Sequence, residues 1–294
     1  MNSFKFSWKA LLYLLPSTVI FMVFMVWPLA YTIYLSFFKW NMISPVKRFV
    51  GFDNYLAIFE DENTFMIVQN TLWYIFWIIV FAVILPYILA FVLNHLLPKF
   101  VNFYKSILFI PAVMSLVVAS VLFTWILNPI SGPIALILRH FHIDMPFWSN
   151  TEGWVIFVLS LVVAWKVFGY NFILLLSAIS GIDQSIIEAA KMDGISNGRI
   201  FLNLVLPLSS ATGVYVLIMS VVQALQYVFT PISVLTQGGP DNASVNMIYE
   251  SYRQGFEMFN TGRSAAISVL TLVFCVILLI LEYIFVERGV YYEN

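Results

Sequence analysis

Long apolar stretches alternate with polar segments along the chain, and six of the stretches are long enough to cross a membrane. A helix needs about 20 apolar residues to span a hydrocarbon core roughly 30 Å thick. Inside that core, only helices and closed barrels satisfy every backbone hydrogen-bonding group. The pattern therefore predicts an all-α polytopic membrane protein with six transmembrane helices, over about residues 10–37, 70–92, 106–127, 154–179, 205–228 and 265–285.

The first apolar stretch is expected to remain in the mature protein. It is longer than the apolar core of a signal peptide, which has roughly 7–15 residues, and it lacks a convincing small-x-small cleavage site. Pro16 and Pro28 either kink this span or lie near its ends.

The segments between spans are expected to be solvated loops. Residues 39–65 carry several acidic side chains, and Asn128-Pro129 with Gly132-Pro133 breaks the chain after the third span. A long polar loop is expected between the fifth span and Arg263.

The segment before the fifth span has a more specific pattern. Glu188-Ala189-Ala190 begins like a helix, Asp193-Gly194 favours a tight bend because Gly accepts positive φ, and Leu206-Pro207 suits the start of a new helix. We expect two short helical pieces that meet near Gly194 outside the bilayer. Such a shape either provides a knob for a partner on one side of the membrane or is only an amphipathic surface helix.

Composition agrees with a membrane protein and excludes several other classes. The 294 residues are 62% hydrophobic and 10% charged, whereas soluble domains carry roughly 25% charged residues. The net charge of −1 and the absence of a basic run argue against nucleic-acid binding. Cys275 is the single cysteine, so the chain forms no internal disulfide.

The sequence offers no catalytic or metal site. It contains no G-x-x-x-x-G-K-[ST] phosphate loop, no HExxH or CxxC spacing, and no converging Ser/His/Asp set. The chain is therefore not expected to be an enzyme or to bind a cofactor or metal.

Polar side chains within the fourth and fifth spans are candidates for a solute pathway. Ser220, Gln223 and Tyr227 fall at i, i+3 and i+7 on one helical face, and Gln226 lies on the adjoining face. In the fourth span the candidates are Lys166, Tyr170 and Asn171. An intramembrane lysine should face protein or water. Alternatively, Lys166 snorkels or caps a neighbouring helix, and Gln and Ser hold helices together.

The distribution of Lys and Arg favours one orientation slightly. Both termini and the second and fourth interspan loops share a side, which carries Lys5, Lys9, Lys99, Lys105, Lys191, Arg199 and Arg288. The opposite side carries Lys39, Lys47, Arg48, Arg139, Arg253 and Arg263. The short loop around Lys99 makes the first side the expected cytoplasmic one.

Three motifs resemble one known family. The pattern from Glu188 to Pro207 resembles the cytoplasmic EAA loop of permease subunits in bacterial ABC importers, with Leu204 in place of the usual Ile and Ala211 in place of a second Pro. Thr236 to Pro240 resembles the Thr-x-Gly-Gly-Pro signature of carbohydrate-uptake permeases of the maltose and sn-glycerol-3-phosphate type. Residues 49–55 resemble a further signature of these permeases. The similarity is greatest to the glycerol-3-phosphate branch.

This resemblance implies a binding-protein-dependent importer in the bacterial inner membrane, with a coupling helix between the fourth and fifth spans and both termini cytoplasmic. The implied partners are a second, different permease, a cytoplasmic ATPase dimer that uses ATP and Mg, an extracytoplasmic solute-binding protein, and membrane lipid. The implied ATPase-coupling residues are Glu188, Ala189, Ala190, Asp193 and Gly194. The implied docking residues for the binding protein are Gly238, Gly239 and Pro240, which otherwise form only a turn.

The expected organisation is a first helix with its extracytoplasmic loop over residues 1–65, a five-helix permease core over 66–288, and a tail over 289–294. The alternatives are an ion-coupled secondary transporter and a membrane scaffold or sensor. No Asp or Glu lies centrally within a span, which argues against the ion-coupled transporter.

Overall fold

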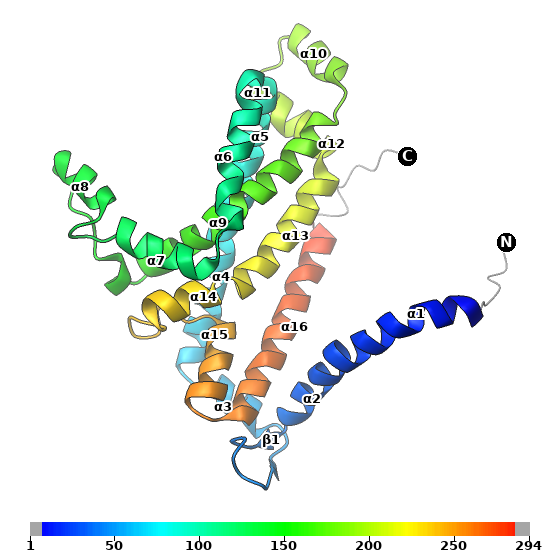
Figure 1. Ribbon diagram of the computed structural model, residues 1–294, viewed down its shortest axis with the longest axis vertical. Helices are drawn as coiled ribbons and strands as arrows, with labels where there is room; N and C mark the ends of the chain where they lie inside the picture. The colour runs from blue at the N-terminus through cyan, green and yellow to red at the C-terminus, as the bar shows by residue number, and fades with distance from the viewer. Residues whose placement is uncertain (1–7, 286–294) are drawn as a thin grey trace. The chain divides into compact units, whose positions relative to one another are not determined.

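The computed structural model describes residues 8–285, and these residues are mostly helical (Figure 1). This agrees with the all-α prediction; one ladder of two-residue strands, β1 (Phe38–Lys39) and β2 (Arg48–Phe49), is the exception in the described range. The expected tail, 289–294, lies outside the described residues. The longer α-helices are α1 (Trp8–Phe21), α2 (Trp27–Leu35), α4 (Asn63–Ile79), α5 (Leu85–His95), α6 (Val101–Val113), α7 (Leu116–Ile126), α9 (Trp154–Ser180), α13 (Ser210–Gln226) and α16 (Thr261–Phe285).

Within the described residues, five continuous helical stretches are long and apolar enough to cross a membrane, and a bent pair of helices brings the number to six. The continuous stretches are Leu12–Leu35, Asn63–His95, Trp154–Ser180, Ser210–Thr236 and Thr261–Ile284. The first two contain the π-helical turns η1 (Met22–Val26) and η2 (Val80–Ile84).

The third expected span is not a straight helix. Helices α6 and α7 meet at an angle of 105°. Met114 and Ser115 are extended, with ψ of 144° and 149°, and the Ser115 hydroxyl caps α7 by accepting a hydrogen bond from the N–H of Val118. Hydropathy measures length and composition, so it does not register a two-residue break inside an apolar run.

The boundaries of the fifth span also differ from the expectation. A helical segment precedes it, formed by α11 (Asn197–Ile200), η5 (Phe201–Val205) and α12 (Leu206–Leu208). The span begins at Ser210 and continues through α14 (Phe229–Pro231) and η6 (Ile232–Thr236). The prediction of a long polar loop after residue 228 is wrong, because α15 (Met247–Tyr252) and η7 (Arg253–Glu257) in that segment are helical.

The described chain divides into two compact units. The first contains residues up to Asp61 together with Glu250–Leu272. In it, the amide of Asn54, in α3 (Asp53–Phe59), donates to the carbonyls of Ser36 and Phe38 at 2.8 and 3.1 Å. Asn54 thus fastens α3 to the end of the first span.

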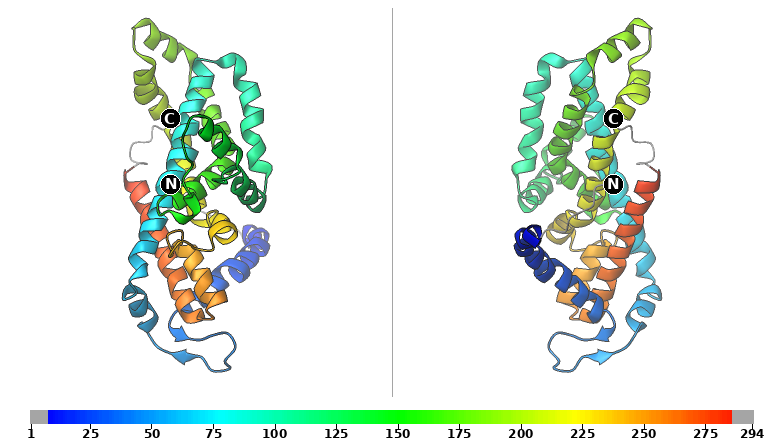
Figure 2. Two further views of the ribbon diagram at one scale, coloured as in Figure 1. Left: turned by 90° about the vertical axis from the view of Figure 1, so that its left-hand side faces the viewer. Right: turned by 90° about the vertical axis from the view of Figure 1, so that its right-hand side faces the viewer.

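The second unit contains Glu62–Tyr249 and the chain from Val273 onward. Helix α9 packs against α4, α5 and α6 (Figures 1 and 2). The core beside α9 includes Phe91, Phe172, Leu176 and Ile187, all buried. Ile187 comes from α10 (Gln184–Met192), so the short helix after α9 is anchored on this core.

Candidate functional site

A partly polar cavity of about 400 Å³ lies between α6, α9 and α13. It brings together four side chains that the sequence marked as pathway candidates: Lys166, Tyr170, Gln223 and Tyr227. The other lining residues are Phe109, Ala112, Val167 and Met219. The cavity therefore combines an ammonium, an amide and two phenols with apolar walls.

Lys166 also caps the broken end of α6. Its Nζ donates to the carbonyl of Ala112 at 3.0 Å and to the carbonyl of Met114. The carbonyls at a helix C-terminus lack intrahelical donors and carry partial negative charge, which a cation stabilises. An ammonium has three N–H donors, so these two bonds leave one N–H of Lys166 to donate elsewhere.

Gln223 offers an acceptor to the same cavity. Its Oε1 is buried and accepts no hydrogen bond from the described residues. A buried acceptor without a partner costs free energy unless water or a ligand satisfies it.

Asn171 and Ser220 lie apart from the cavity lining and join helices. The buried amide of Asn171 donates to the carbonyl of Ala82 at 2.6 Å and to Ser220 Oγ at 3.2 Å. Pro86 explains the first bond, because it has no N–H for the carbonyl four residues before it. Gln226, the remaining candidate, is exposed at the end of α13.

The helix and turn expected around Gly194 are present. The Asp183 carboxylate accepts a hydrogen bond from the N–H of Ser185 at 2.9 Å, which starts α10 and holds the pKa of Asp183 below its ordinary value. At the other end, Gly194 has φ of +73°. Its N–H donates to the carbonyl of Lys191, and the N–H of Ile195 donates to that of Ala190. These two bonds form a Schellman motif, which favours glycine at the positive-φ position.

The five predicted coupling residues divide into two groups. Ala190 packs inward on the core beside α9, whereas Glu188, Ala189, Asp193 and Gly194 are exposed. Met192 is 88% exposed, so the outer surface combines carboxylates with a prominent apolar side chain.

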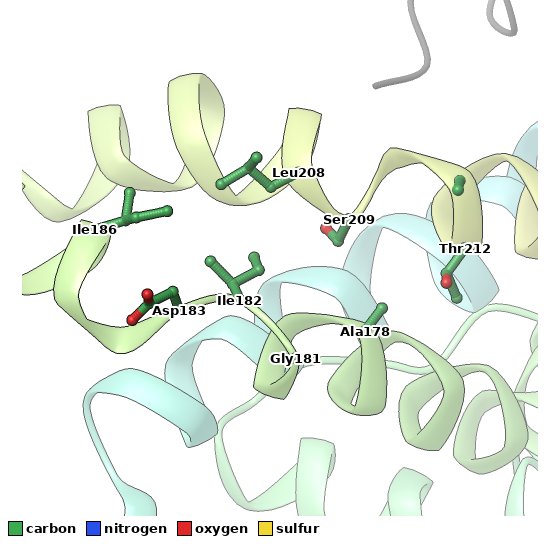
Figure 3. A pocket seen from close by; sticks show the side chains of 9 residues that line it. Ala178, Gly181, Ile182, Asp183, Ile186, Leu208, Ser209 and Thr212 are labelled. Atoms are coloured by element: carbon green, nitrogen blue, oxygen red, sulfur yellow. The ribbon is translucent and has the colours of Figure 1, made fainter. Parts of the chain in front are cut away.

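A cleft of about 260 Å³ lies at the base of α10 (Figure 3). Ile182, Ile186 and Leu208 point toward one another across it. Nearby, where α12 ends and α13 begins, Ser209 Oγ donates to the carbonyl of Val205 and lies 2.5 Å from the hydroxyl of Tyr87. Sequence reasoning missed this contact because Tyr87 and Ser209 are far apart in the chain.

The turn at Gly238-Gly239-Pro240 is held by the second span. Ser244 Oγ donates to the carbonyl of Gly239 at 2.7 Å, and the buried Tyr74 donates to the carbonyl of Ser244 at 2.9 Å. Gly238, with φ of +91°, is itself buried, and Gly239 and Pro240 are half-buried. Nothing in the local sequence of Tyr74 marks it as the support for this turn.

The chain is similar to a known family of transport proteins. The family of binding-protein-dependent transport system inner membrane components matches residues 82–289. The sn-glycerol-3-phosphate transport system permease protein UgpA of Yersinia enterocolitica is 31% identical over 293 residues, covering 99% of this chain and 98% of that protein. UgpA of Escherichia coli O157:H7 is 29% identical over 304 residues, with the same coverage.

A solved structure of a bacterial ABC transporter involved in the import of the acidic polysaccharide alginate has a similar fold. The TM-score is 0.80 at 21% identity, covering 96% of each chain. A second structure, of the alginate ABC transporter in complex with an alginate pentasaccharide-bound periplasmic protein, gives the same score and covers 96% of this chain and 94% of that one.

The family resemblance inferred from the motifs is thus confirmed by a match to most of the chain. The full-length similarity to UgpA and the several apolar helices lead to the same conclusion. The chain belongs to the binding-protein-dependent transport system inner membrane components, and it is a multi-pass membrane protein.

Proposed function

We propose that this chain is the permease subunit of an ATP-driven importer and forms half of a solute pathway through the cavity between α9 and α13. The observation that carries this proposal is the convergence of Lys166, Tyr170, Gln223 and Tyr227 on one cavity. A second, different permease contributes the other half. Both termini and α10 face the cytoplasm in this arrangement.

The exposed end of α10 docks on a cytoplasmic ATPase dimer that binds ATP and Mg. Glu188 and Asp193 offer carboxylates for basic side chains, and Met192 offers an apolar contact. Because Ile187 and Ala190 anchor α10 on the core beside α9, a push on α10 moves the helices that line the cavity. The turn at Gly238–Pro240 lies on the opposite side of the membrane and contributes to docking of a solute-binding protein.

The solute is a sugar or sn-glycerol 3-phosphate. Tyrosine and glutamine side chains suit a hydroxyl-rich molecule, and the remaining donor of Lys166 suits a phosphate ester. The similarity to UgpA supports the phosphate ester. Of the two, sn-glycerol 3-phosphate fits the charge in the cavity better.

Uptake into proteoliposomes that contain the complete importer tests this function. We expect uptake of sn-glycerol 3-phosphate that requires ATP, the ATPase and the binding protein. Uptake driven only by an ion gradient would instead identify a secondary transporter.

Lys166→Gln tests the charge in the cavity. It should reduce uptake of sn-glycerol 3-phosphate about tenfold, which corresponds to the loss of one charge-assisted contact. If the wild type takes up maltose and Lys166→Gln changes that uptake little, the solute is instead a neutral sugar.

A further inference from the structure

A second cavity, of about 460 Å³, lies between α4 and the start of α9 and is unlike the solute cavity. It is lined by Trp73, Trp77, Trp154 and Phe157 together with Glu152, Gly153 and Ile156. We call it the aromatic box. Glu152 is the one charged side chain among the described residues that line it, and it is exposed.

The chemistry of the aromatic box favours a cation. Tryptophan faces attract ammonium groups, and a carboxylate beside them adds opposite charge. Within the described part of the chain, Glu152 has no hydrogen-bond or ion-pair partner. Its negative charge is therefore available to a ligand and disfavours an anion.

An apolar groove adjoins the box. A cavity of about 320 Å³ is lined by residues of α9, α6 and the α4–α5 stretch: Phe81, Leu85, Ile107, Leu108, Pro111, Leu161, Ala164, Trp165 and Phe168. The ring centroids of Phe157, in the box, and Phe81, in the groove, are 5.5 Å apart. Trp154 and Trp165 are separated by about 16 Å along α9 at 1.5 Å per residue, which is close to the length of a phospholipid acyl chain.

Box and groove occupy one face of α9, and the solute cavity occupies another. Helical periodicity places Trp154, Leu161 and Trp165 on one side of the helix. The same periodicity places Tyr170 on the opposite side and turns Lys166 about 100° away from Trp165. A ligand in the box and groove thus lies away from the proposed solute pathway.

The position of the box matches a membrane interface. Trp154 begins one candidate span, and Trp73 lies in the first third of a stretch of 33 residues, which is longer than a bilayer core requires. Tryptophan is enriched where the headgroups of lipids meet the acyl chains. A water-soluble ligand would not need the adjoining apolar groove for binding, whereas a lipid would.

We propose that the aromatic box and groove bind a phospholipid with a primary ammonium headgroup. The ammonium lies among the tryptophans beside Glu152, and an acyl chain follows the groove along α9. This site is separate from solute transport, so its test does not depend on uptake.

Native mass spectrometry of the assembled importer tests the proposal with two lipids that share dioleoyl chains, phosphatidylethanolamine and phosphatidylglycerol. We expect wild type to retain phosphatidylethanolamine with about tenfold preference, as one ammonium–aromatic contact with a carboxylate implies. Glu152→Gln should abolish the preference without weakening phosphatidylglycerol, and since Glu152 is exposed, folding should be unaffected. The matched control is Glu60→Gln, which changes an exposed carboxylate outside the box.

A second variant tests the groove. Leu161→Trp fills it and should reduce retention of both lipids to the same extent. Equal retention of the two lipids by wild type, or an unchanged preference in Glu152→Gln, would overturn the proposal. Displacement of the lipid by maltose would also overturn it and assign the box to a carbohydrate.

Discussion

The side-chain amide of Asn171 donates a hydrogen bond of 2.6 Å to the backbone carbonyl of Ala82, across the interface between α9 and the second span. Pro86 leaves that carbonyl without its usual helical donor. An unsatisfied carbonyl is costly in a bilayer, where no water replaces the donor. Asn171 thus compensates for the donor that Pro86 lacks in a neighbouring helix.

We expect Asn171→Leu to destabilise the protein by about 1–2 kcal/mol, because it leaves the carbonyl of Ala82 unsatisfied. Thermal unfolding of the purified importer in detergent measures the change. Asn102→Ala, at an exposed position, is the control and should leave the melting temperature unchanged. Equal melting temperatures for Asn171→Leu and wild type would show that this hydrogen bond contributes nothing.

Gly169 allows α9 to approach α6 closely. A Cβ at this position would lie 1.9 Å from the carbonyl oxygen of Leu108, so the helices would have to separate. We expect Gly169→Ala to cost at least about 1–3 kcal/mol. The same unfolding measurement applies. At Gly181 the nearest contact of an added Cβ is 3.4 Å, so Gly181→Ala should be tolerated.

A substitution of Gly194 tests the coupling role proposed for α10. A β-branched residue at φ of +73° costs about 1–2 kcal/mol and reshapes the turn. We expect Gly194→Val to lower uptake about tenfold while ATP hydrolysis by the importer continues. The two rates are measured in the same proteoliposomes.

The same change at Gly198 provides the control, because an added Cβ meets open space there and φ is not positive. Normal uptake by Gly194→Val would contradict the coupling role.

A substitution of Tyr74 tests whether its hydroxyl supports the Gly238–Pro240 turn. Tyr74→Phe removes only the hydroxyl that donates to the carbonyl of Ser244, and should destabilise the protein by about 1 kcal/mol. If the turn contributes to docking, affinity for the binding protein should also fall, as surface plasmon resonance measures. The exposed Tyr283 gives the matched control, Tyr283→Phe. Unchanged stability and affinity in Tyr74→Phe would rule out this support.

The sequence by itself determined the helical membrane class, the family and the turn at Gly194. These follow from local properties: spans need a certain length of apolar residues, and a positive-φ turn favours glycine. It also marked polar positions in α9 and α13, but helical periodicity alone did not separate Gln223, which lines the cavity, from Ser220, which joins helices.

Only the tertiary structure decided which groups those side chains meet. Lys166 reaches carbonyls at the break after α6, and Asn171 reaches Ala82. Both partners lie more than 50 residues away in the chain. The physical reason is that a polar group in a membrane must find a partner among neighbouring helices, and helix packing rather than sequence spacing places that partner within reach.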